Sequence, residues 1–233
     1  MSRPPRLSLR TASRTARKAA SAPDCRPPAP RLPLTVGEAR AALVGPRTGP
    51  GHVLGIDQAT TSGWALCDLE TRKCVLSGVA RGAEAQQDAL SLLARVPGHS
   101  WPSTLVVFED HRGIPASEGI PTAGLLSLGE ARGRWAALLS QAGQSEEARV
   151  LAAPDAWRRL LGTRRNLPRK AWKAQAVMWA SAITGRRIES DDEAEAVVIA
   201  MWGAHEGLVR WATERAEVGA CARARLRSKG KSG

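Results

Sequence analysis

Four acidic side chains stand where they would act together on a phosphodiester bond. Asp57 and Glu109 each end a short apolar run, while Asp192 and Glu195 lie three residues apart at the start of a helical pattern. Residues at that spacing share one helix face. Carboxylates at the ends of buried strands cost free energy unless a cation compensates them, and Mg²⁺ or Mn²⁺ prefers such oxygen ligands. We therefore predict a site for two divalent ions that activates water for phosphodiester cleavage.

Each acid taken alone also has a structural interpretation. An acid that ends a strand is often a turn or cap residue. Asp191 or Asp192 would equally serve as a helix N-cap, with Glu195 completing a capping box. The combination of all four acids in this order is what favours metal binding. His111 is a lesser candidate ligand, and a surface-loop histidine is the alternative interpretation.

The periodicity of apolar residues places the acids on strands and helices that alternate along the chain. Strands are expected at Val53–Asp57, Gly63–Leu69, Lys73–Val79, Thr104–Glu109 and Arg149–Ala152. Helices are expected at Ala83–Arg95, Pro121–Ala142, after Pro154, at Pro168–Thr184 and at Asp191–Glu206. Periodicity by itself indicates an α/β domain. The order of the elements is that of an RNase H-like fold, a mixed five-stranded sheet flanked by helices.

The net charge of +12 belongs to the two ends of the chain. Residues 1–52 carry ten Lys and Arg against two acids, residues 212–233 carry six against two, and residues 53–211 have equal numbers of each. Basic ends suit a polyanionic partner such as DNA, with a solubilising tail as the alternative. We predict a disordered Pro/Arg-rich arm at 1–51, a nuclease domain at 52–211 and a basic tail at 212–233.

The cysteine pattern and the apolar runs bear on where the protein works. The four cysteines form no CxxC pair, which predicts a reducing, cytoplasmic compartment. No apolar run reaches the length of a membrane span, so no membrane association is expected. The N-terminal segment lacks the apolar stretch of a secretory signal. Its Arg, Ser and Ala content leaves an organelle transit peptide as an alternative to the disordered arm.

Five short motifs in order resemble those of RuvC-type Holliday-junction resolvases, within the RNase H-like superfamily, and span about residues 52–206. The first is Gly55-Ile56-Asp57 with Ser62-Gly63-Trp64-Ala65, the second Phe108-Glu109-Asp110 and the third Leu128-Gly129-Glu130-Ala131-Arg132-Gly133. The fourth is discontinuous and consists of Pro154, Arg158, Leu161-Gly162, Arg169-Lys170 and Lys173-Ala174-Gln175-Ala176-Val177. The fifth is Asp192-Glu193-Ala194-Glu195-Ala196. Each motif is short, but five at plausible spacing are fairly specific.

The resemblance implies a Mg²⁺-dependent homodimer that binds branched DNA and nicks two strands symmetrically. The metal ligands and catalytic acids it implies are Asp57, Glu109, Asp192 and Glu195. It further implies a phosphate contact for Lys173, which Lys170 would be able to replace, and DNA contacts for Arg112 and Arg132. Without the resemblance, a solvated helix face is the simpler interpretation of the two lysines.

Two departures from the family pattern bear on activity. Glu195 stands where the family usually has Asp, and its longer side chain should still reach a metal but change rate or ion preference. Arg112 stands where the family tends to have an aromatic wedge, which puts junction opening by stacking in doubt. Arg112 would instead stack on a base or bind a phosphate.

Two other functions are alternatives to the nuclease. The segment Gly55–Ser62 also resembles the first phosphate loop of sugar kinases and actin-like ATPases. Those proteins need a second duplicated domain, and this chain has neither the length nor a second glycine-rich loop. A non-catalytic DNA-binding protein on the same fold would be expected to have lost one or more of the four acids, and here all four positions are acidic.

Overall fold

The computed structural model describes residues 50–111, 122–162, 167–210 and 212–213. Nearly all of the predicted arm 1–51 and tail 212–233 lies outside these residues, and so does Arg112. No helix within the described ranges has both the length and the apolar character needed to cross a membrane.

The described chain folds around one mixed five-stranded sheet. Its strands are β1 (His52–Asp57), β2 (Thr61–Asp68), β3 (Cys74–Arg81), β4 (Thr104–Glu109) and β5 (Arg149–Ala152). The strand order is β3-β2-β1-β4-β5. The first three strands form an antiparallel meander, and β4 and β5 run parallel to β1. The predicted fold class, an RNase H-like mixed sheet flanked by helices, is confirmed.

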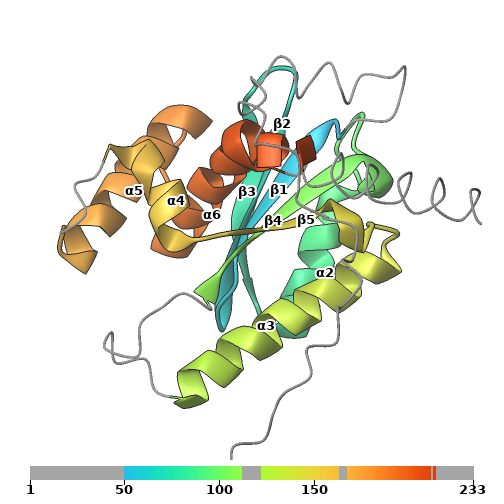
Figure 1. Cartoon of the computed structure of the whole chain (residues 1–233), viewed down its shortest axis with the longest axis horizontal. Helices are drawn as coiled ribbons and strands as arrows, with labels where there is room; N and C mark the ends of the chain where they lie inside the picture. The colour runs from blue at the N-terminus through green and yellow to red at the C-terminus, as the bar shows by residue number, and fades with distance from the viewer. Residues whose placement is uncertain (1–49, 112–121, 163–166, 211, 214–233) are drawn as a thin grey trace, which may run out of the picture. The chain divides into compact units, whose positions relative to one another are not determined.

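Helices cover both faces of this sheet. They are α2 (Gly82–Leu93), α3 (Thr122–Gln141), α4 (Pro154–Arg158), α5 (Arg169–Thr184) and α6 (Asp191–Trp202). Short 3₁₀ turns occupy Trp101–Ser103, Glu146–Ala148 and Arg159–Leu161. Helices α4, α5 and α6 lie on one side of the sheet and α2 and α3 on the other, as Figure 1 shows.

Alternation along the central strands divides the core into two layers. In β1, Val53 belongs to the layer under α6, whereas Leu54 and Ile56 belong to the layer under α2 and α3. In β4, Val107 and Phe108 divide in the same way. All residues of β1 and β4 are buried, because each face of a central strand in such a sheet is covered by helices.

The last predicted helix is interrupted near its end. The pattern predicted one helix over Asp191–Glu206, but the α-helix ends at Trp202 and a π-helical turn follows over Gly203–Gly207. At Gly203 a Cβ atom would lie 2.6 Å from a methyl carbon of Val107, so the helix presses on the sheet there. A 3.6-residue repeat cannot reveal a single widened turn.

Candidate active site

Strand parity sets Asp57 and Glu109 on the same face of the sheet. The parallel register pairs Gly55 with Val107, and the two acids lie two residues further along β1 and β4. Because side chains alternate, both acids point to the face that carries Val107 and α6. Asp57 is 7% exposed and Glu109 5% exposed. The sheet therefore buries two carboxyl groups side by side at the carboxyl ends of β1 and β4.

Gln58 holds the two strand ends together. Its side-chain amide donates to the carbonyl oxygen of Glu109, and its side-chain oxygen accepts from the Glu109 backbone N–H at 3.1 Å. The side chain is 1% exposed and continues the ladder one step past the end of β1. The role of Gln58 was not predictable from the sequence, because a glutamine after a strand carries no signal of such pairing.

Two glycines let α6 lie directly on β1 and β2. A Cβ at Gly55 would fall 2.3 Å from the backbone nitrogen of Ala200, and a Cβ at Gly63 would fall 1.8 Å from the carbonyl oxygen of Asp192. Any larger residue would push the helix away. The close contact brings the first turns of α6, with Asp192 and Glu195, onto the face that carries Asp57.

The first turn of α6 is capped by a residue other than the acids. Ser190 is the N-cap, and its side-chain oxygen accepts from the backbone N–H of Glu193 at 3.4 Å. The alternative in which Asp191 or Asp192 caps the helix and Glu195 completes a capping box is therefore wrong. Because Ser190 is the cap, neither Asp192 nor Glu195 is needed as a capping residue of this helix.

Burial and neighbouring acids raise the pKa of three of these acids, Asp57, Asp192 and Glu195. Burial raises the pKa of Asp57 well above its ordinary value, and the negative charges of Glu195, Glu109 and Asp192 raise it further. Burial raises the pKa of Glu195 to about 7, against the opposing charge of Lys173. Burial and then Asp191 raise the pKa of Asp192, while Lys173 and Arg169 lower it. The four predicted acids thus form one electrostatic cluster.

Lys173 from α5 is a cation within this cluster. Its ammonium forms a short ion pair with Asp191 and lies 3.3 Å from Glu195 Oε1. Burial alone would lower its pKa, but the hydrogen bond to Asp191 and the charge of Glu195 leave that pKa raised, so the lysine stays charged. This one lysine interacts with three carboxyl groups, those of Asp57, Glu195 and Asp191, so the acidic groups around it outnumber it.

Glu109 contacts α4 and the turn that follows β4. Its Oε1 accepts a hydrogen bond from the indole N–H of Trp157 at 3.2 Å and lies 3.9 Å from the Arg158 guanidinium. Its Oε2 lies 3.6 Å from His111 Nδ1, so the lesser candidate of the sequence analysis lies beside the predicted site. Trp157 was not predicted to contact an acid.

The donor set fits a hard divalent cation in its chemistry. Three of the four carboxylates are buried, and Glu195 Oε1 has no hydrogen-bond partner in the described residues beyond the ion pair with Lys173. Among the described residues, however, no three His, Cys, Asp or Glu side chains lie in an arrangement that could already hold a metal ion. Glu195 and Glu109 are instead turned toward Lys173, Trp157 and Arg158.

The predicted DNA-binding residues are more dispersed. Lys170 is exposed in the first turn of α5, one turn before Lys173. Arg132 is half-buried on α3, which covers the opposite face of the sheet, so the structure does not bring it to the acids. Arg112 lies outside the described residues.

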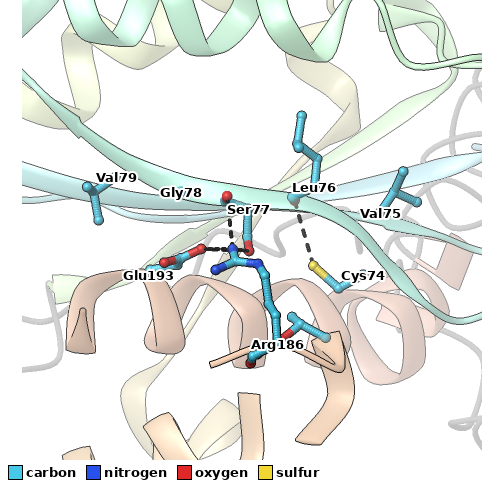
Figure 2. A pocket seen from close by; sticks show the side chains of 9 residues that line it. Cys74, Val75, Leu76, Ser77, Gly78, Val79, Arg186 and Glu193 are labelled. Carbon is cyan, nitrogen blue, oxygen red and sulfur yellow. Dashed lines mark hydrogen bonds and ion pairs between the residues drawn. The ribbon is translucent and has the colours of Figure 1, made fainter. Parts of the chain in front are cut away.

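A second charged cluster lies at the edge of the sheet, on β3. Figure 2 shows Arg186 reaching from the segment before α6 to Ser77 and Glu193. The guanidinium donates to the Ser77 carbonyl oxygen at 3.2 Å and forms a short ion pair with Glu193, whose carboxylate also accepts from the Ser77 hydroxyl at 2.8 Å. Each charge in this cluster has a partner of opposite sign, which is typical of a structural ion pair.

Three solved structures share features of this fold. Thermus thermophilus RuvC, in complex with a Holliday junction substrate, is 16% identical over 66% of this chain and 92% of that chain, with a TM-score of 0.48. A second T. thermophilus RuvC structure gives the same identity and TM-score and is covered over 93% of its length. The yeast mitochondrial Holliday junction resolvase Ydc2 is 14% identical over 76% of this chain and 85% of that chain, with a TM-score of 0.38. No family model and no curated protein matches the sequence.

Proposed function

We propose that this chain is a metal-dependent endonuclease that cuts phosphodiester bonds in branched DNA, in the manner of a Holliday-junction resolvase. The observation that carries the proposal is the buried cluster of Asp57, Glu109 and Glu195 on one face of the sheet, with Asp192 beside it. Burial raises the pKa of Asp57 and of Glu195, so the fold gains no stability from their charged forms, and such a cluster is expected where function requires it.

The residues of the cluster have distinct roles in this proposal. Asp57, Glu109, Asp192 and Glu195 hold the metal, with Gln58 fixing the strand ends that carry the first two. Bound Mg²⁺ or Mn²⁺, as two ions, would supply an activated water and stabilise the leaving oxygen. Lys173 keeps its charge and binds the phosphate next to the scissile bond, and Lys170 extends that contact along the DNA.

The assembly and the DNA structure are part of the same proposal. We expect a homodimer, because two sites related by a two-fold axis would nick two strands of a junction symmetrically. A cytoplasmic location remains a prediction of the sequence. Sedimentation of the full chain with and without a four-way junction measures the assembly.

The decisive experiment is a nicking assay of the full chain on four-way, flap and linear DNA with Mg²⁺ or Mn²⁺. Asp57→Asn is expected to lower the nicking rate by about a thousandfold or more, because it removes a ligand at the centre of the cluster. Asp88→Asn changes an exposed aspartate of α2 on the opposite face and should leave the rate unchanged. Equal rates for Asp57→Asn and the wild type would rule out this site.

Deletion of residues 1–49 tests the basic arm. The shortened chain is expected to bind DNA more weakly and with a flatter dependence on salt, because fewer counterions are released. Binding measured from about 50 to 200 mM salt gives the slope. An unchanged slope would show that the arm does not contact DNA.

A further inference from the structure

The two carboxylate oxygens of Glu109 have different neighbours. Oε1 accepts a hydrogen bond from Trp157 Nε1 at 3.2 Å, while Oε2 lies 3.6 Å from His111 Nδ1, beyond hydrogen-bond length. Arg158 approaches Oε1 as well, at 3.9 Å, so it adds positive charge without a hydrogen bond. One oxygen therefore accepts a hydrogen bond from the protein, and the other accepts none from any described donor.

The indole that engages Oε1 is held firmly. Trp157 is 0% exposed, and its ring meets Trp172 edge to face with centroids 5.8 Å apart. The guanidinium of Arg158 lies 4.2 Å from the centre of the Trp172 ring and 5.1 Å from that of Trp157, within cation–π range. Packed between these neighbours, the indole has little freedom to turn away from Glu109.

Backbone pairing places the Trp157 ring beside Glu109. Strand β5 lies beside β4, with Ala152 paired to Glu109, and the Asp110 backbone N–H donates to the Ala152 carbonyl oxygen at 2.7 Å. Helix α4 begins two residues later with Pro154 at its first position, where a fixed φ suits a helix start. The first turn of α4 therefore faces the end of β4, and Trp157 lies in that turn.

We infer that Trp157 is a positioning residue that holds Oε1 of Glu109 and so leaves Oε2 as the oxygen that binds a divalent cation. This inference rests on the proposed function. An indole N–H is a donor only and does not titrate, so it cannot exchange roles with the carboxylate at any working pH. Partners that orient a metal ligand in this way typically contribute ten- to a hundredfold to metal affinity.

Calorimetric titration of the full chain with Mn²⁺ tests the inference. Trp157→Phe keeps most of the ring and removes the N–H, and Mn²⁺ binding is expected to weaken about tenfold. Trp135→Phe is the matched control, because Trp135 is also 0% exposed and its Nε1 has no hydrogen-bond partner in the described residues. That control should bind Mn²⁺ as the wild type does, although both variants lose some thermal stability.

A measurement on the wild-type chain covers the case in which Trp157→Phe does not fold. The indole N–H resonance of Trp157 is expected to shift when Mg²⁺ is added, and that of Trp135 to stay in place. No shift at Trp157, or equal Mn²⁺ affinity for the two variants, would overturn the inference. Glu109→Gln distinguishes failure of the metal site from failure of the positioning role of Trp157. If it binds Mn²⁺ as tightly as the wild type, the metal site itself is wrong, and the role of Trp157 falls with it.

Discussion

Glu193 and Glu195 lie two residues apart on α6 and are similarly buried, at 8% and 5% exposed, yet their surroundings differ. Two residues turn a helix by about 200°, so the two side chains leave it in different directions. Glu193 meets Arg186 and Ser77 at the edge of the sheet. Glu195 meets Lys173, which it shares with Asp191, and has Asp57 and Glu109 nearby.

This difference distinguishes a carboxylate that stabilises the fold from one that the fold must tolerate. The ion pair of Glu193 with Arg186 joins the segment before α6 to β3. The guanidinium also donates a hydrogen bond to the carbonyl oxygen of Ser77 on this edge strand. Glu195 keeps a pKa of about 7 because burial and neighbouring acids disfavour its charge. Strain of that kind is typical of a site where stability is given up for function.

The largest effect on stability is expected from substitution of Gly63, because the positions of Glu193 and Glu195 depend on the close contact of α6 with this glycine. Gly63→Ala would place a methyl group 1.8 Å from the Asp192 carbonyl oxygen, a backbone atom that cannot move aside alone. We expect the free energy of unfolding to fall by about 4 kcal/mol, or the chain not to fold. Chemical denaturation followed by circular dichroism measures the change.

Gly129→Ala is the matched control for that substitution. Gly129 lies inside α3, and a Cβ there would have no heavy atom within 4 Å. Alanine is expected to stabilise the chain by about 1 kcal/mol through helix propensity. A similar loss of stability in both variants would show that close contact with α6 is not what Gly63 provides.

The two glutamates are expected to respond in opposite directions to loss of charge. At pH 8 without added metal, Glu193→Gln should lower the free energy of unfolding by about 1 kcal/mol, because Arg186 loses its counterion. Glu195→Gln should raise it by about 2 kcal/mol, because a raised pKa means that the charged form is disfavoured in the folded chain. Changes of the same sign in the two variants would remove the distinction between the two regions.

The same raised pKa also predicts a dependence of stability on pH. The folded chain raises the pKa of Glu195 from 4.5 to about 7, so between these values it binds more protons than the unfolded chain. The contribution of Glu195 to stability without metal should therefore be greatest below about pH 4.5 and fall as the pH rises toward 7. Asp57, whose pKa is also raised, adds to the same trend.

Saturating Mg²⁺ should reverse this slope, because a cation binds the deprotonated carboxylates and stabilises the folded chain more as they ionise. Thermal melts of wild type and Glu195→Gln from pH 4.5 to 8, with and without Mg²⁺, measure both slopes. A wild-type slope that is the same in the two conditions would argue against cation binding by these acids.

Much of the fold was predictable from local patterns. Strands β4 and β5 begin and end at the predicted residues, because their buried runs are bounded by clear changes in composition. The four acids were predictable as a set because strand ends and a helix start are visible in the sequence. The contacts of Lys173 with Asp191 and Glu195 were not, since they join two helices whose approach depends on packing.

The sequence by itself determined which residue types would stand at the strand ends and at the start of α6, since periods of 2 and 3.6 residues fix faces within one element. Only the tertiary structure decided how those faces meet. It showed that Ser190 rather than an acid caps α6, that Gln58 joins two strands, and that Trp157 donates to Glu109. These contacts join separate segments, and no local pattern records the distance between segments that meet only after folding.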